Sequence, residues 1–308
     1  MKLDFSVKQA LKVVVVLVCA VAVIAASIIM INGDDDKIKN KNNELWNTIK
    51  ELNGSGGSES GGSGGGSNNP TSGPNGEPLV STTESQVGKY ADIDGDGTVD
   101  GIIFADLIIG GSGEYGPSGM GTYTIPTISS SKSYYVSQES YTNKLGGTAE
   151  VLTPIGTGEN RFYIMALSNI SNSTYDWYNA AYGKMNDYGT TTSQDFGSGK
   201  ENTSTMIAKW NNKDYGDQNT CTNHKDLWGQ IQKKANDGWF VPSRQEWVAF
   251  AGNLGITNSN YSSKGLTGWY WSSSQDSIHS AYNAHFNPNY VIYDSVNDCN
   301  YVRLAATF

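Results

Sequence analysis

The stretch GWFVPSRQEWVAFAGNLGI, residues 238–256, contains the clearest secondary-structure signal in the chain. Ser243 and Glu246 have the spacing of a capping box, in which the two residues reciprocally bond free backbone N–H groups at the start of a helix. Apolar side chains then recur at helical spacing as far as Leu254, and Gly255 suits a left-handed C-terminal cap. The stretch therefore predicts an amphipathic helix that begins after Ser243.

On both sides of this helix, short apolar runs are broken by Gly, Asn and Ser. Two weaker helices are predicted at about 226–236 and 204–210. Strand-like composition occurs in RFYIMALS, WYWSSS, NAHF, NYVIY and NYVRLAATF. Few short helices and many short, irregular strands predict an α+β domain rich in loops, which we place at residues 78–308.

The composition narrows the possible partners. The chain has 308 residues, a net charge of −9 and 17% charged residues, below the roughly 25% of a typical soluble domain. Such a chain offers no basic surface to phosphates, which argues against a nucleic-acid partner. Three cysteines provide no disulfide framework. Cys221 could pair with Cys299, or form a zinc site with His224, His285 and Cys299, but their spacing requires neither.

The N-terminus predicts a membrane anchor. Residues 13–31 read VVVVLVCAVAVIAASIIMI without a charge, which is long enough for a helix to span the roughly 30 Å hydrocarbon layer. Lysines precede this segment and aspartates follow it, so the positive-inside rule places the rest of the chain outside the cell. We expect residues 1–36 to form a cytoplasmic tip and a single-pass anchor in the cell membrane, with a cleaved signal peptide as the alternative.

A stalk and a linker are expected next. Residues 37–53 predict a short juxtamembrane helix, and the apolar seam at 38–52 could support a weak homo-oligomer. Residues 54–77 are almost wholly Gly, Ser, Asn and Pro, a composition typical of a flexible linker.

The loop DIDGDGTVD, which begins at Asp92, resembles a calcium-binding loop. Asp92, Asp94, Asp96 and Asp100 occupy positions 1, 3, 5 and 9, with glycine at position 6. Ile103 stands where an EF-hand has its glutamate, so the loop is not an EF-hand. We expect a structural Ca²⁺ site at these four aspartates, or else an Asp/Gly turn that is satisfied by its own backbone.

No catalytic residue is predicted, and we expect no enzymatic activity. The motif GSGEYG at 111–116 matches a dinucleotide-binding fingerprint, but Pro117 and further glycines follow it where a helix should begin. Outside the Gly/Ser-rich linker, the chain also contains no GxSxG nucleophile elbow.

The tail has an unusual composition. From Asp276 to Val302 it reads DSIHSAYNAHFNPNYVIYDSVNDCNYV and lacks Lys, Glu, Gln, Met and Trp, all of which need a purine in the third codon position. Every residue type present can be written with a third-position pyrimidine. Replacement of adenines in AAY asparagine codons produces such a set.

These features together resemble the variable proteins of diversity-generating retroelements. The resemblance rests on residues 238–256, GWYWSSSQ, the tail and the final NYVRLAATF, and GKYADIDGDGTVDGIIFADL is similar to the beginning of such domains in gut bacteria. It covers roughly residues 86–308. It implies a C-type lectin-like fold of the formylglycine-generating-enzyme type, with a variable region at about 272–308 that error-prone copying at adenine rewrites.

The resemblance also implies two sets of residues. The fixed scaffold would comprise Ala281, Ala284, Phe286, Val291, Val296, Val302, Arg303 and Leu304. The diversified, ligand-binding positions would be Asp276, Ser277, Ile278, His279, His285, Asn287, Pro288, Asn289, Tyr290, Ile292, Tyr293, Asp294, Ser295, Asn297, Asp298, Cys299 and Asn300.

The function implied is that of a membrane-anchored, surface-displayed receptor whose tail binds a protein or glycan on another cell or phage. A fixed-specificity adhesin or carbohydrate-binding protein of lectin-like fold is the alternative, in which the tail is an ordinary Asn/Ser-rich loop. An enzyme of the same fold would need copper or a reactive cysteine, and neither Cys221 nor Cys299 lies in a matching motif.

Overall fold

A computed structural model describes residues 70–308, except 118–120, 179–191, 213–224 and 288. These residues belong to one compact unit, Ser67–Phe308. The segments predicted as a membrane anchor (13–31) and a juxtamembrane helix (37–53) lie outside the described residues, as does most of the predicted linker at 54–77.

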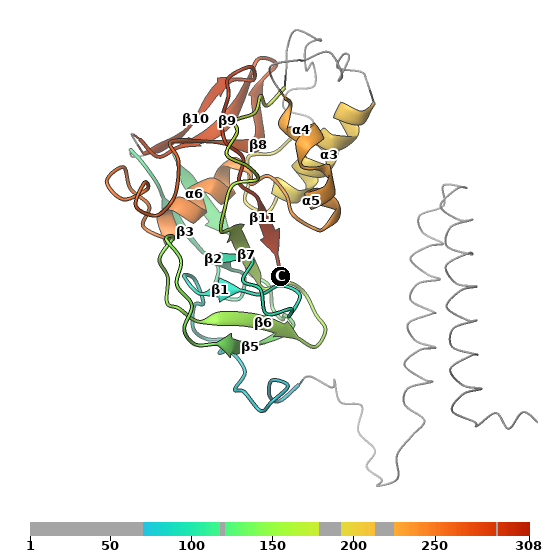
Figure 1. Ribbon diagram of the computed structural model, residues 1–308, viewed down its shortest axis with the longest axis vertical. Helices are drawn as coiled ribbons and strands as arrows, with labels where there is room; N and C mark the ends of the chain where they lie inside the picture. Colours follow the sequence, from blue (N-terminus) through green and yellow to red (C-terminus); the bar gives the residue numbers. More distant parts are fainter. Residues whose placement is uncertain (1–69, 118–120, 179–191, 213–224, 288) are drawn as a thin grey trace, which may run out of the picture. The chain divides into compact units, whose positions relative to one another are not determined.

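The larger of the sheets has six strands in the order β11-β7-β2-β1-β6-β5 (Figure 1). The strands are β1 (Tyr90–Ala91), β2 (Gly101–Asp106), β5 (Ser133–Gln138), β6 (Val151–Ile155), β7 (Phe162–Ala166) and β11 (Ala305–Thr307). Only β1 and β6 are parallel, and the other neighbouring pairs are antiparallel. β2 is buried along its whole length, as its continuous apolar run GIIFAD leads one to expect.

Two smaller sheets complete the described strands. One has the order β10-β9-β8 and the other pairs β3 with β4. Their strands are β3 (Gly111–Glu114), β4 (Thr122–Ile125), β8 (Trp269–Ser277), β9 (Ser280–His285) and β10 (Tyr290–Ser295). The pairing of β8 with β9 is irregular, because the register shifts on both sides of Gln275.

The described residues form four helices, and the helix predicted after Ser243 is among them. The helices are α3 (Gly199–Asn211), α4 (Leu227–Gln230), α5 (Gln232–Asn236) and α6 (Arg244–Asn253). The capping box is confirmed: the Ser243 hydroxyl accepts from the Glu246 N–H at 3.2 Å, and Glu246 Oε2 accepts from the Ser243 N–H at 2.6 Å. α6 packs against both the three-stranded sheet and β2.

The other two helix predictions were less accurate. The helix expected at 226–236 is divided at Ile231 into α4 and α5. The helix expected at 204–210 is the middle of the longer α3, whose first turn is buried at Gly199, Asn202 and Thr203. Buried polar residues at a helix start give no apolar periodicity, so the sequence pattern revealed only the later part of α3.

The predicted fold class is wrong in its proportions of helix and strand. The chain was expected to be α+β and C-type lectin-like, whereas the structure is mostly strands with few short helices, 30% strand against 15% helix. The physical reason is the brevity of the apolar runs: segments such as TYTI in β4 alternate between exposed and buried residues with the period of a strand. A run of this length is too short to support a helix.

The predicted transmembrane helix is not supported either. Within residues 70–308, as far as they are described, no helix is both long enough and apolar enough to cross a membrane.

Three apolar clusters hold the unit together. The first lies between α6 and the sheets and includes Phe104, Trp247 and Phe286. The second gathers Trp177, Trp228 and Trp271 near α4. The third lies against the six-stranded sheet and includes Phe162 and Phe308. Phe308 is 1% exposed, and its backbone N–H and carbonyl both bond to Phe162, so the segment after the tail closes the edge of this sheet.

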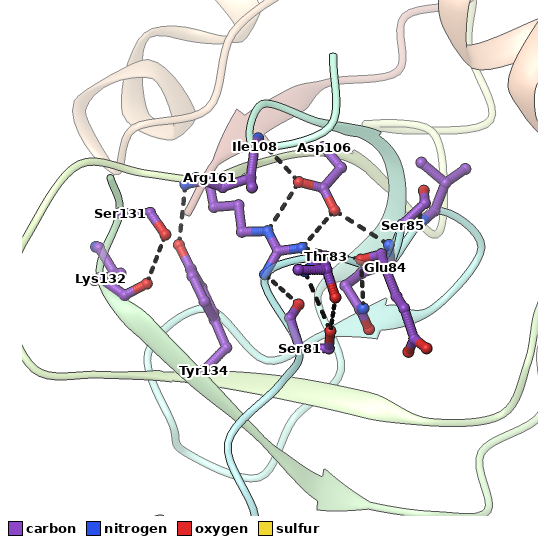
Figure 2. Close-up of polar contacts among 12 residues, drawn as sticks. Ser81, Thr83, Glu84, Ser85, Asp106, Ile108, Ser131, Lys132, Tyr134 and Arg161 are labelled. Atoms are coloured by element: carbon purple, nitrogen blue, oxygen red, sulfur yellow. Dashed lines mark hydrogen bonds and ion pairs between the residues drawn. The ribbon is translucent and has the colours of Figure 1, made fainter. Parts of the chain in front are cut away.

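A buried ion pair fastens the segment before β1 to the six-stranded sheet. The Arg161 guanidinium lies between the Asp106 carboxylate and the backbone carbonyls of Ser81 and Glu84 (Figure 2). Both Arg161 and Asp106 have side chains that are only 1% exposed. Asp106 also accepts from the N–H groups of Ile108 and Gln86, so both charges are surrounded by hydrogen bonds, as buried charges require.

Candidate functional site

The C-terminal sheet β8–β9–β10 separates buried from accessible residues along the predicted variable tail. All eight residues expected as scaffold are buried. Tyr270, Ala284 and Val291 lie opposite one another on the three strands and belong to the cluster around α6. At the other end of the sheet, Ala281 and Val296 belong to the cluster of Trp271. The tail therefore contributes side chains to two parts of the core.

Most of the predicted ligand-binding residues are accessible. Of the seventeen, all but Pro288 are described, and fourteen of these sixteen are exposed or half-buried. Tyr293 is the most accessible large side chain, at 54%. His285 and Asn300 are the exceptions, with only 7% and 3% exposed. The set follows the end of β8, the strand β10 and the segments that connect β8, β9, β10 and β11.

An aromatic row crosses all three strands. His285 on β9 lies opposite both Trp269 on β8 and Tyr290 on β10. The imidazole stacks on the Trp269 indole with ring centroids 3.3 Å apart and meets the Tyr290 ring edge-on at 5.4 Å. Burial lowers the pKa of His285 below its ordinary value, so the ring is neutral at pH 7. Trp269 itself is 41% exposed.

A polar pair lies farther along the same face. The Asn283 side-chain amide donates to Asp294 Oδ2 at 2.7 Å. Burial raises the pKa of Asp294, whereas this hydrogen bond acts in the opposite direction. On β9, Asn283 shares a face with His285, because alternate residues of a strand point to the same side.

Trp269 and Asn283 were not among the predicted ligand-binding residues. The predicted set began at Asp276 and did not include the residues between the scaffold alanines. A signal for Trp269 does exist in the sequence: it opens the strand WYWSSS next to Gly268, at the point where the chain enters the sheet. The cross-strand register that brings it beside His285 is not encoded in any local pattern.

The opposite face carries a second aromatic pair. Tyr282 and Tyr293 lie directly across from each other, with ring centroids 6.2 Å apart and planes at 88°. The Arg244 guanidinium from α6 lies 5.0 Å from the centroid of the Tyr282 ring. Beside them, the Ser280 hydroxyl donates to Asp276 Oδ2 at 2.9 Å.

The turn between β9 and β10 is held from outside the sheet. Asn289 adopts a left-handed backbone conformation, with φ of +78°, and its side-chain oxygen accepts from the Tyr115 hydroxyl at 3.3 Å. Gly116, with φ of +87°, lies so close to the Asn289 carbonyl that a Cβ would collide with it. A cavity of about 360 Å³ lies beside this contact and is bordered by Ile256.

The aspartate loop gathers three of its four predicted ligands. Asp92, Asp94 and Asp100 bring carboxylate oxygens within 4.8 Å of one another, so this group could hold a metal ion. Asp96 is not a member, and its Oδ1 accepts from the Thr98 N–H at 2.7 Å. The group thus includes three of the four aspartates that were predicted as ligands, and the metal itself stays a prediction.

The electrostatics of this loop favour a cation. Burial raises the pKa of Asp100, and the negative charges of Asp94 and Asp92 act in the same direction. Both oxygens of Asp92 accept backbone N–H groups, from Gly95 at 2.8 Å and Gly97 at 3.0 Å. These bonds account for one lone pair on each oxygen, and the Thr153 hydroxyl also lies 3.5 Å from Oδ2. Oδ1 keeps its second lone pair for a ligand.

The predicted cysteine and histidine pairings lie largely outside the described residues, since Cys221 and His224 fall in the segment 213–224. Cys299 is exposed, and its thiol donates to Asp176 Oδ1 at 3.4 Å. Within the described part of the chain, no group of potential metal ligands includes His285 or Cys299.

Comparisons of this chain with models of protein families, with curated proteins and with solved structures found no match.

Proposed function

We propose that this chain is a non-catalytic ligand-binding protein whose binding surface is the C-terminal sheet and its turns. The observation that carries the proposal is the division along residues 276–304. Eight apolar or scaffold residues are buried, while fourteen of the sixteen described candidate residues between them remain accessible. A surface built in this way can change its side chains while the packing beneath it stays the same.

The composition of the accessible set supports the same function. Tyr, Ser, Asn and His supply rigid amphipathic contacts and adaptable hydrogen bonds, the combination found in antibody binding loops. Exposed substitutions away from special backbone positions usually change stability by less than about 0.5 kcal/mol. The ligand in this proposal is a protein or a glycan, and the retroelement resemblance supplies the source of variation.

A fixed-specificity adhesin is the competing function, and sequencing of the locus in sibling isolates distinguishes the two. Retroelement diversification predicts substitutions confined to adenine-containing codons of residues 276–301, with a near-copy of this sequence beside a reverse transcriptase gene. A tail that is identical in all isolates contradicts diversification and favours the adhesin.

Binding by the sheet itself is tested by tail exchange. Residues 276–300 are replaced by those of a naturally occurring variant, or by a set with altered residues only at the accessible positions. We expect ligand choice to change in a pull-down from a displayed protein library, while Tm shifts by only a few degrees. An exchange that leaves ligand choice unaltered in a folded protein contradicts the proposed surface.

For the aspartate loop, we propose Ca²⁺ as the metal. Hard carboxylate oxygens and a glycine-rich turn suit Ca²⁺, and the repulsion among Asp92, Asp94 and Asp100 would be relieved by a divalent cation. The role is structural, because the loop joins the adjacent strands β1 and β2. Thermal unfolding in CaCl₂ and in EDTA tests it, and an identical Tm in both contradicts it.

A further inference from the structure

An unpaired acceptor lies beneath the accessible face of the C-terminal sheet. Asn283 is fully buried, and its Nδ2 donates to Asp294, which as a carboxylate can only accept. This bond fixes the orientation of the amide, so that Oδ1 points away from Asp294, and Oδ1 has no hydrogen-bond partner among the described residues. Nδ1 of His285, two residues along the same face, also has none. A buried acceptor is costly to leave unpaired, so Asn283 Oδ1 favours a ligand that donates a hydrogen bond.

Aromatic rings lie beside these two atoms. The register places Trp269, His285 and Tyr290 in one row and Trp271, Asn283 and Ile292 in the next, all on one face of the sheet. Trp271 is buried in the second apolar cluster, so the accessible part of this face lies at the first row and along β10. Asp294 follows Ile292 at the next position of β10 on this face. The face thus combines an accessible indole, a phenol ring, a buried acceptor and a carboxylate. Faces of aromatic rings attract cations, most strongly when the ring is that of tryptophan.

The Asp, Glu, Lys and Arg content of this region is entirely acidic. Between residues 269 and 302 the chain contains Asp276, Asp294 and Asp298 but no Lys, Arg or Glu. Two guanidinium groups lie near the sheet, and both contact tyrosines of the other face: Arg244 lies over Tyr282, and Arg303 lies over Tyr270 at 5.6 Å. The face with the aromatic row therefore offers an unpaired acceptor and negative charge without Lys or Arg among its own residues.

We propose that this face binds a Lys or Arg side chain from a protein ligand, between the Trp269–His285–Tyr290 row and the Asn283–Asp294 pair. The inference rests on the proposed ligand-binding function and names the chemistry of its partner. The cation would contact the aromatic row, donate to Asn283 Oδ1 and compensate the charge of Asp294. An acidic segment would be repelled by Asp294, and an apolar one would leave the Asn283 acceptor unpaired.

The test uses the full chain and four probes. Three are ten-residue Gly/Ser peptides that differ at three positions, which hold Lys-Lys-Arg, Gln-Gln-Gln or Glu-Glu-Glu. The fourth is the neutral oligosaccharide maltohexaose, whose hydroxyls donate hydrogen bonds without charge. Affinities are measured by biolayer interferometry at 50 and 150 mM NaCl. We expect the basic peptide to bind at least tenfold more tightly than any other probe, and to weaken as salt rises.

Matched variants locate the contact. Trp269→Ala and Asp294→Asn should each weaken binding of the basic peptide at least fivefold, and Trp269→Phe should retain most of it. Glu139→Gln makes the same change of charge as Asp294→Asn, at an exposed residue directly after β5, and should alter binding less than twofold. Circular dichroism and Tm establish that each variant is folded. If Trp269→Ala does not fold, the comparison of Asp294→Asn with Glu139→Gln provides the test.

Every other outcome overturns the inference. If the glutamine peptide or the sugar binds as tightly as the basic peptide, and Trp269→Ala abolishes that binding, the cationic partner is wrong while the binding surface stands. If the basic peptide binds equally to all variants, it binds elsewhere. If no probe binds, the inference fails on its own, because the proposed function is judged separately by tail exchange.

Discussion

The Arg161 guanidinium meets the Asp106 carboxylate through two parallel hydrogen bonds of 2.8 Å, from Nε to Oδ1 and from Nη2 to Oδ2. Because both groups are buried, removal of one leaves the other charge without compensation. We expect Asp106→Ala to lower the free energy of unfolding by about 3–5 kcal/mol in urea denaturation. Lys89→Gln, which breaks the accessible pair with Glu150, should cost less than about 1 kcal/mol. Equal effects of the two variants would contradict this assignment.

Glu246 predicts a dependence of stability on pH. Its carboxylate accepts from the N–H groups of Ser243, Gly197 and Gly199, but complete burial dominates and raises its pKa to about 7. A group whose pKa is higher in the folded state contributes its full stabilisation of the fold at a pH below its unfolded-state pKa, here near 4.5. This contribution is lost as pH rises towards 7, the folded-state pKa.

The corresponding measurement compares urea denaturation of the protein and of Glu246→Gln at pH 4.5 to 8. We expect the difference in unfolding free energy between the two to change by on the order of 3 kcal/mol across this window. The variant should also be less stable at low pH, because the amide cannot accept from both sides of the capping box. Parallel pH profiles would show that the carboxylate does not titrate there.

The aspartate loop predicts unequal effects of two similar substitutions. Asp100→Asn should abolish the Tm increase caused by Ca²⁺, whereas Asp96→Asn should preserve it, because Asp96 lies outside the group of three. At a Ca²⁺ concentration one hundred times the Kd, the increase corresponds to about 2.7 kcal/mol. Differential scanning calorimetry in CaCl₂, MgCl₂ and EDTA measures it, and an equal loss in both variants would contradict the three-residue group.

Gly116 couples the β3–β4 hairpin to the turn that precedes β10, at the edge of the proposed binding surface. Gly116→Ala would place a Cβ against the Asn289 carbonyl in addition to straining a backbone with φ of +87°. We expect a larger fall in Tm than for Gly238→Ala, where φ is +92° but no atom lies within 4 Å. Ligand affinity should also fall, because the displaced turn carries Tyr290. A Tm loss equal to that of the control would mean that the turn adapts freely.

Two residues of β10, Val291 and Tyr293, should differ sharply in how well they tolerate substitution. Tyr293→Ser changes a side chain that is 54% exposed, and we expect an unfolding free energy within about 0.5 kcal/mol of the parent. Val291→Ser buries a hydroxyl in a site that is 2% exposed and should cost about 2–4 kcal/mol. Chemical denaturation of both proteins checks this, and similar losses would contradict the division between scaffold and surface.

Local patterns in the sequence predicted local structure well. The α6 capping box needed only Ser243 and Glu246 at the correct spacing, and the burial of Val291 and Val296 followed from apolar residues isolated in a polar tail. The balance of strand and helix was predicted less well, because apolar runs of four to six residues do not distinguish the two.

Long-range pairing could not be predicted from one sequence. Arg161 and Asp106 are 55 positions apart, and no local pattern links them. The row of Trp269, His285 and Tyr290 depends on strand register, which is shifted along β8 by irregularities around Gln275. Asp96 fits the calcium pattern in spacing, yet it lies outside the group that Asp92, Asp94 and Asp100 form.

The position of β11 has a consequence for how the tail can change over generations. The residues that close the edge of the six-stranded sheet, including buried Phe308, are encoded downstream of the proposed binding surface. An insertion or deletion upstream that disturbs the reading frame would erase this closing strand along with the altered surface. Chains with point substitutions at exposed positions would therefore still fold, whereas frameshifted chains would not, independently of any ligand.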